Sequence, residues 1–304
     1  MPDIASKQKT YGLFAALAAF FAWGLLPIYW KSLIVVNPVE ILCHRIIWSL
    51  VFIAIILTIL KGWKETFASM RSPKDIGILI LSSLMIGGNW LLYIWAVNTN
   101  HVLETSLGYF INPLVTTLLG YIFFRERLKP LQLVAIGLAT LGVANSIFSY
   151  GELPWISLTL ALSFAFYGLL RKIASVESLP GLFLETMVLA PLALTYLIKM
   201  QMDGTSAFFT VSPTIDLLLI GAGAATATPL IGFAYGARRL QLSTLGVLQY
   251  VGPSIAFILG VYVYKEPFTA SHLVTFTLIW SGLAVYTGES IWSMRTHRRL
   301  TRKE

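Results

Sequence analysis

The chain has 304 residues, of which 57% are hydrophobic and only 12% are charged. An ordinary soluble domain carries about 25% charged residues, so this composition excludes a water-soluble fold. The net charge of +8 does not indicate a nucleic-acid partner, because the basic residues form short clusters between apolar runs, which is the charge pattern of a membrane protein.

Ten apolar runs follow one another along the chain, each of roughly the 20 residues that a helix needs to cross a bilayer. They are long and continuous and lack strand-like alternation, so we expect helices rather than barrel strands. The first run is too long, and lacks the small-residue site, for a cleaved signal peptide. The runs cover residues 11–31, 40–60, 76–98, 102–123, 131–148, 154–170, 180–198, 214–237, 242–262 and 271–291.

Basic residues fix the expected orientation. If the amino terminus is cytoplasmic, 18 of the 22 lysines and arginines fall in cytoplasmic segments, as the positive-inside rule requires. Residues 1–10 and the basic tail 292–304 are therefore predicted to be cytoplasmic, and the tail could also contact anionic lipid. The single cysteine, Cys43, lies inside the second run, which rules out an intrachain disulfide or a cysteine-rich metal site.

The chain contains an internal repeat. At an offset of 140 residues, the fourth and ninth runs share a central proline, a glycine and a terminal glutamate, and the first and sixth runs match at an offset of 144. The sequence thus predicts a five-helix repeat at 11–148 and another at 149–291. Because five is odd, the second repeat must cross the membrane in the opposite sense, as in inverted-repeat transporters. The shared positions include Pro113 with Pro253, Glu126 with Glu266, and Phe20 with Phe164.

The two prolines lie in the middle of apolar runs. A helical proline leaves the carbonyl four residues earlier without its partner, here those of Tyr109 and Gln249. Such a carbonyl must face protein, a polar group or water. Pro113 and Pro253 are therefore either symmetric hinges along a substrate path or packing kinks satisfied by neighbouring helices.

Few ionisable residues lie inside the apolar runs, and each is a functional candidate. Arg45 could clamp a carboxylate or phosphate through its planar fork, or form a structural ion pair with Glu40 or Glu104. His44 is either a protonation switch or a packing residue. Glu104 and Glu185 could carry coupling protons if burial raises their pKa; otherwise they lie at the membrane interface or are ion-paired.

Aromatic and amide side chains are abundant on the same runs. We expect them to line a cavity that stacks on a flat or apolar solute and fixes it with a few hydrogen bonds. An amino acid, an aromatic metabolite or a drug-like compound would suit such a cavity. With Arg45, His44, Glu40 and Glu104, the predicted substrate-binding residues are Trp23, Asn89, Trp90, Tyr93, Tyr109, Asn112, Tyr167, Gln249 and Tyr250.

An enzyme would need a catalytic constellation. The four histidines show no metal-ligand spacing, and no Gly-rich phosphate loop or nucleophile elbow occurs. We therefore expect no enzymatic activity, no metal site and no cofactor. A channel or facilitative pore for small metabolites, which would have to build its filter from the two halves of one chain, is the alternative to a carrier.

Four segments resemble the RarD group of the EamA family, within the drug/metabolite transporter superfamily. They are IGGNWLLYIWAV (86–97), SLGYFINPLV (106–115), LSFAFYGLLRK (162–172) and LSTLGVLQYVGPS (242–254). The resemblance implies ten helices, the bacterial inner membrane and transport of small organic solutes, often outward. ERLKPLQLVAIG (126–137) also resembles the wider family pattern, in which a glutamate ends the fourth helix and is followed by a glutamine and then a glycine. The second half departs from this pattern, because Pro267 follows Glu266 and no matching glutamine appears.

Together these features predict an all-α, multi-pass secondary transporter, and the family resemblance implies an exporter. Its two inverted five-helix units would rock around a midplane site by alternating access. Protons are a candidate coupling ion. Substrate, direction and oligomeric state are left open by the sequence.

Overall fold

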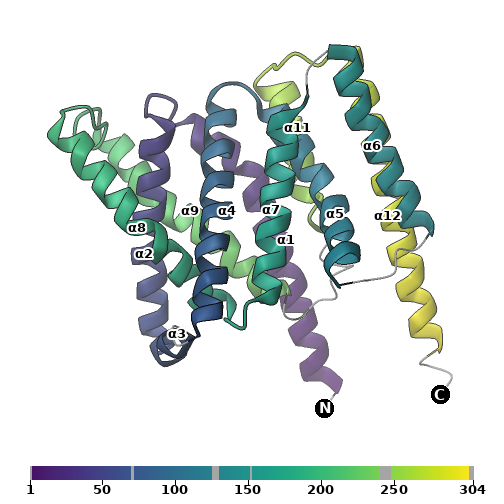
Figure 1. The fold of residues 1–304 in the computed structure, drawn as a ribbon, viewed down its shortest axis with the longest axis horizontal. Helices are drawn as coiled ribbons and strands as arrows, with labels where there is room; N and C mark the ends of the chain where they lie inside the picture. The colour runs from purple at the N-terminus through teal and green to yellow at the C-terminus, as the bar shows by residue number, and fades with distance from the viewer. Residues whose placement is uncertain are drawn as a thin grey trace.

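In the computed structural model, the described residues are 2–69, 72–124, 130–150, 153–237, 239 and 248–300. They form helices joined by short connections, with no β-strand among them (Figure 1). Seven of these helices are long and apolar enough to cross a membrane, and three shorter apolar helices lie at 130–145, 251–263 and 270–286. The chain is therefore a polytopic helical membrane protein, as predicted. Ten crossings remain a prediction.

The helices begin and end close to the predicted runs. The first begins at Pro2, so most of the segment predicted as a cytoplasmic extension is helical. A short helix also occupies the predicted loop between the second and third runs. The elements are α1 (Pro2–Lys31), α2 (Pro38–Ile59), α3 (Trp63–Ser69), α4 (Pro73–Asn98), α5 (Val102–Phe124), α6 (Pro130–Tyr150), α7 (Trp155–Ile173), α8 (Ser178–Met202), α9 (Pro213–Ala237), α11 (Val251–Ile258), the π-helix η1 (Leu259–Val263) and α12 (Ala270–Leu300).

Local sequence explains several of these boundaries. Helix α2 starts with a proline in its first turn, and the Asn37 side chain accepts a hydrogen bond from the Val39 N–H. Helix α4 also starts with a proline, and Ser72 accepts from the Asp75 N–H at 3.2 Å. Proline fits the first turn because its missing N–H would have no helical partner there, and Asn and Ser satisfy neighbouring N–H groups.

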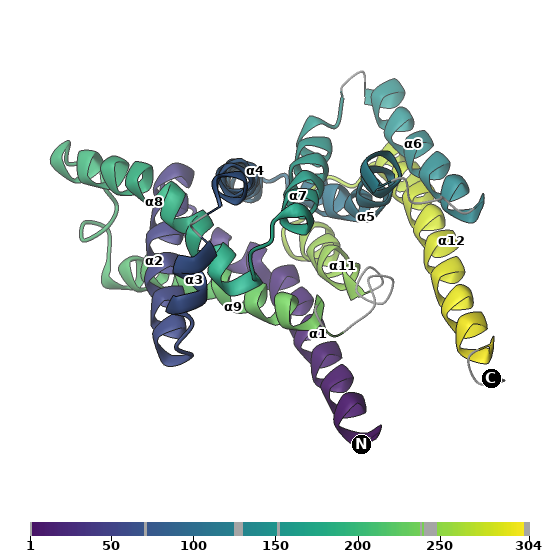
Figure 2. The same ribbon diagram turned by 60° about the horizontal axis from the view of Figure 1, so that its bottom comes forward.

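The most extensive helix contacts join the two predicted repeats rather than helices of one repeat. Helix α6 packs along α12, α5 along α7, α1 along α9, and α2 along both α8 and α9. Figure 2 shows α6 and α12 together at one edge of the molecule, with α2 and α8 at the other edge. The two halves of the chain are therefore interleaved.

Helix α1 begins and α12 ends at the same end of the bundle, the bottom in Figure 1. We call this the terminal end and the opposite one the distal end. Two termini on one side agree with the sequence prediction; their placement in the cytoplasm stays a prediction. Glu126 and the loop 125–129, together with residues 240–247 at the start of the ninth run, lie outside the described residues.

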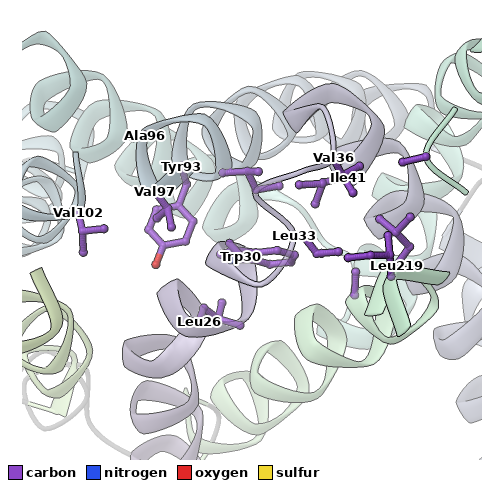
Figure 3. Packing of buried hydrophobic residues seen from close by; sticks show 14 of the residues in the cluster. Leu26, Trp30, Leu33, Val36, Ile41, Tyr93, Ala96, Val97, Val102 and Leu219 are labelled. Carbon is purple, nitrogen blue, oxygen red and sulfur yellow. The ribbon is translucent and has the colours of Figure 1, made fainter. Parts of the chain in front are cut away.

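A buried apolar cluster fills the distal end. Helix α1 contributes Leu26 and Trp30, α4 contributes Tyr93 and Val97, and α9 contributes Leu219 (Figure 3). Trp30 and Leu219 are fully buried. These residues come from both halves of the chain. Together they form a distal cluster that closes the bundle at the end away from the termini.

Candidate functional site

A cavity lies near the middle of the bundle, between α1, α2, α4, α5, α7, α9 and the segment around the start of α11. It leaves about 80 Å³ for the centres of water-sized molecules. The cavity is therefore larger than the space that a single water needs, roughly 10–15 Å³.

Repeat-equivalent residues line the cavity in pairs. The first and sixth runs contribute a pair related by the offset of 144, and the other pairs are related by the offset of 140. The cavity thus lies where the predicted twofold relation between the repeats would place a midplane site. The pairs are Phe20 with Phe164, Trp90 with Leu230, Tyr93 with Phe233, and Tyr109 with Gln249.

The structure brings part of the predicted set together here. The aromatic residues among those that sequence reasoning missed are Phe20, Phe164 and Phe233. Repeat matching could have found all three, because Phe20 pairs with Phe164 and Phe233 is the equivalent of Tyr93. The predicted binding residues that line the cavity are Trp23, Arg45, Asn89, Trp90, Tyr93, Tyr109 and Gln249.

Arg45 is the only charged residue among the described residues lining the cavity. It projects from the second turn of α2 and is 4% exposed. The guanidinium carbon lies 4.2 Å from the centre of the Trp90 ring and 5.1 Å from that of Trp30, within the range of cation–π attraction. Within the described part of the chain, Nε and Nη1 have no hydrogen-bond partner.

The two predicted asparagines have different roles. Asn89 faces the cavity, and its Nδ2 donates to the Leu160 carbonyl at 3.0 Å and to the Ser163 hydroxyl at 2.9 Å. Asn112 lies outside the lining, where its Nδ2 donates to the Ala161 carbonyl and its Oδ1 accepts from Gln249 Nε2, both at 3.0 Å. Asn112 therefore orients Gln249 and does not line the cavity.

Glu40, predicted as a substrate residue, is instead part of a distal contact. Its Oε1 accepts hydrogen bonds from the Ser206 hydroxyl and the Ala207 N–H at 2.8 Å, and from the Phe208 N–H at 3.3 Å. The carboxylate is 1% exposed. It therefore fastens the connection between α8 and α9 to the start of α2, because carboxylates are strong acceptors for backbone N–H groups.

His44 lies beside the same connection and outside the cavity lining. Its Nδ1 accepts from Trp48 Nε1 at 3.3 Å, and its ring contacts Phe208 with 4.6 Å between ring centres. This arrangement fits the packing alternative for His44. Glu104 is also remote from the cavity, since it pairs with His101 at 3.9 Å near the distal start of α5. Both partners considered for an Arg45 ion pair are thus engaged elsewhere.

A second buried carboxylate closes the distal end. Glu266 follows η1, and its two oxygens accept from the Val102 and Leu103 N–H groups at 2.9 and 2.8 Å. These are the first N–H groups of α5, which have no partner within the helix and attract negative charge. Glu266 therefore caps α5 from the other repeat.

Lys31 strengthens the same region. Its Nζ donates to Asn100 Oδ1 at 2.5 Å and lies 4.7 Å above the Tyr264 ring. Burial raises the pKa of the Tyr264 phenol, and the Glu266 carboxylate raises it further. The phenol thus stays neutral at physiological pH, and the lysine meets an uncharged ring.

Tyr167 belongs to a polar cluster between α4, α7 and α8, and does not line the cavity. Its hydroxyl donates to Glu185 Oε2 at 3.2 Å, while Ser82 donates to Oε1 at 2.6 Å. Arg171 Nε lies 3.7 Å from Glu185 Oε1. Glu185 is 1% exposed, so it is both buried, as the coupling-proton alternative requires, and paired with Arg171, as the ion-pair alternative requires.

The equivalent prolines sit in different local structures. Pro113 lies inside the continuous helix α5. The chain makes a turn at Gln249 and Tyr250, so Pro253 falls in the first turn of α11, where no helical hydrogen bond is lost. Of the two prolines predicted to lie in mid-helix, only Pro113 does so. Tyr250 faces Phe110, 6.4 Å between ring centres, outside the cavity lining.

At the terminal end a wider cleft of about 480 Å³ opens between α2, α3, α8 and α9. Its lining includes Lys61, Glu65, Tyr235 and Arg239, and Leu230 lines both this cleft and the central cavity. The cavity is therefore adjacent to an open space toward the termini and is closed at the distal end.

These helices and this cavity define a polytopic membrane transporter. Residues 10–148 match the EamA-like transporter family. The chain belongs to this family, within its RarD group.

Relatives resemble the chain over nearly its whole length. A protein RarD of Salmonella typhi is 46% identical over 290 residues, covering 95% of this chain and 99% of that protein. An uncharacterized transporter of Bacillus subtilis is 46% identical, covering 91% and 93%. A chloramphenicol-sensitive protein RarD of Pseudomonas aeruginosa is 30% identical, covering 95% and 97%.

One solved crystal structure has the same overall fold, with a TM-score of 0.60 and 20% identity. The aligned region covers 92% of this chain and 98% of the chain in that structure. This similarity concerns the fold alone.

Proposed function

We propose that the chain is a secondary transporter that exports a small organic solute across the bacterial inner membrane by alternating access. The observation that carries the proposal is a central cavity lined by repeat-equivalent residues and closed at the distal end. With the termini in the cytoplasm, this arrangement is the inward-facing state, and a solute would enter through the terminal cleft.

The motion differs from the rocking of two separate five-helix units. Such rocking would separate α1 from α9 and α5 from α7, which are among the most extensive contacts in the molecule. We propose instead that the repeats exchange local conformations. Helix α5 is now continuous through Pro113, whereas its equivalent is interrupted before Pro253. In the outward-facing state the interruption would lie in α5.

A reversible distal crosslink tests this mechanism. A β-carbon placed on Gly260 would lie 3.1 Å from Leu103 Cδ2 and 3.5 Å from the Leu103 N, so cysteines at both positions are within reach of a disulfide. The double variant Leu103→Cys/Gly260→Cys would be made in a Cys43→Ala background, since Cys43 is the only native cysteine.

The transported solute is identified first by comparing metabolites inside and outside cells with and without the protein. Its counterflow is then measured in proteoliposomes. Oxidation should stop counterflow in the double variant, and a reductant should restore it, whereas oxidation should not change the counterflow of either single variant. Flux that continues through the oxidised protein would refute distal opening. Unitary currents would support the channel alternative.

A further inference from the structure

The guanidinium of Arg45 is buried in the cavity without an anionic partner. Glu40 accepts from the connection after α8, and Glu104 pairs with His101. The remaining described residues that line the cavity carry no charge. A charge held in an apolar, membrane-spanning bundle is costly unless a counter-charge or ligand meets it.

Two tryptophans restrict how a ligand can approach this charge. With Trp90 and Trp30 rings 4.2 and 5.1 Å from the guanidinium carbon, aromatic surface already surrounds the group. Nε and Nη1 have no hydrogen-bond partner among the described residues, so the donors in the plane of the guanidinium are not saturated. A carboxylate can accept from two of these coplanar donors at once, either Nε with Nη2 or Nη1 with Nη2.

The rest of the cavity favours a flat apolar body beside that carboxylate. Phe20, Trp23, Tyr109 and Phe164 supply aromatic faces and edges. Aromatic pairs of this kind gain energy beyond simple burial. One further polar atom is available, because Asn89 Oδ1 has no hydrogen-bond partner among the described residues.

We propose that Arg45 is the anion anchor of the transport site and that the solute is a small aromatic monocarboxylate. This inference rests on the proposed function and specifies its substrate class. The carboxylate binds the Arg45 donors, the ring packs against the aromatic walls, and Asn89 Oδ1 accepts a hydrogen from a hydroxyl or amino substituent when the solute has one.

Four probes separate the parts of this proposal. Phenylacetate carries both ring and charge, phenylacetamide keeps the ring without the charge, acetate keeps the charge without the ring, and inorganic phosphate is a different anion. Their binding to the full-length protein in lipid nanodiscs is measured by calorimetry, with empty nanodiscs as the blank. Phenylacetate should bind about 10-fold to 100-fold more tightly than phenylacetamide, the usual range for a charge-assisted hydrogen bond.

The variants then locate the charge. Arg45→Gln should remove the preference for phenylacetate over phenylacetamide, and Arg45→Lys should retain only part of it, because lysine lacks the planar fork. Lys199→Gln removes one positive charge from an exposed position on α8 and should change neither value. If Arg45→Gln does not fold, the reduced preference expected of Arg45→Lys locates the charge, and an unchanged preference in that variant would contradict it.

Equal binding of phenylacetate and phenylacetamide, or an unchanged preference in Arg45→Gln, would overturn the anion anchor. Acetate or phosphate binding as tightly as phenylacetate would overturn the aromatic monocarboxylate. Failure of phenylacetate to bind the native protein would overturn the substrate class as well. The distal crosslink test does not depend on these binding results. It would still distinguish a carrier of neutral solutes from a protein that does not transport.

Discussion

The two ends of the cavity are held by different chemistry. At the distal end, an apolar cluster is combined with two carboxylates, Glu40 and Glu266, that bind backbone N–H groups across the repeats. At the terminal end, a cleft of about 480 Å³ reaches Leu230 on the cavity wall. The distal end is therefore closed over the cavity, whereas the terminal end keeps a cleft beside it.

The two distal carboxylates differ in what they hold together. Glu40 joins helices that already pack extensively, whereas Glu266 joins segments that have fewer contacts and could separate. Glu40 ties α2 to the connection between α8 and α9, helices that α2 contacts extensively. Glu266 ties α5 to the segment after η1, where the helix contacts are fewer. We expect Glu266 to control distal opening and Glu40 to support stability.

The largest effect is expected for Glu266→Ala, which leaves two buried N–H groups of α5 without acceptors. Such losses cost about 2 kcal/mol or more, which favours the distally open state by about 30-fold. A cysteine at Phe233 in the cavity, in the Cys43→Ala background, should then react faster with a membrane-impermeant thiol reagent added from the distal side.

Glu40→Gln is the matched control for Glu266→Ala. It should lower the melting temperature, because three hydrogen bonds to one carboxylate oxygen weaken, without changing the reaction rate of the cavity cysteine. Equal rates in the Glu266→Ala and native proteins would remove Glu266 from the opening step.

A second prediction concerns the terminal half of the comparison. If Glu185 carries the coupling proton, Glu185→Gln mimics the protonated carboxyl and uncouples transport from the pH gradient. Uptake driven by a pH gradient in proteoliposomes should fall to the level that the solute gradient supports alone, while counterflow persists. Glu104→Gln, near the distal surface, serves as the control. Retained gradient-driven uptake in Glu185→Gln would exclude this role.

The smallest effects are expected at the prolines, and in opposite directions. Pro113→Ala supplies an N–H to the Tyr109 carbonyl while α5 is continuous, which stabilises the present state. In Pro253→Ala, the new N–H could bond to the Gln249 carbonyl only after the repeats exchange conformations. One hydrogen bond contributes about 0.5–1.5 kcal/mol, or roughly 2-fold to 10-fold. The same cavity cysteine should become less reactive from the distal side in Pro113→Ala and more reactive in Pro253→Ala. Shifts in one direction would contradict the exchange.

The sequence predicted the helical membrane fold, the family and about half of the candidate site. Trp90, Tyr93, Tyr109 and Gln249 were predicted as aromatic and amide side chains on apolar runs, and the structure places all four in the cavity lining. Hydrophobic run length was enough to place the helices that carry them.

Residue chemistry alone was less informative about location. Glu40 lies only five residues before Arg45 on α2, yet one meets a distal connection and the other the cavity. Tyr167 could not be separated from the lining aromatics, because its partner Glu185 lies on another helix. Such assignments depend on which side of a helix faces which neighbour, and that is set by tertiary packing.

The interleaving of the two halves also has a consequence for biosynthesis. When ribosomal synthesis has delivered only α1 to α6 to the membrane, α1 still lacks α9, α5 lacks α7, and α6 lacks α12. The helices of the first half therefore lie in lipid without most of their native helix contacts until the helices of the second half are inserted. Separately translated halves should therefore be degraded when expressed singly and rescued when expressed together.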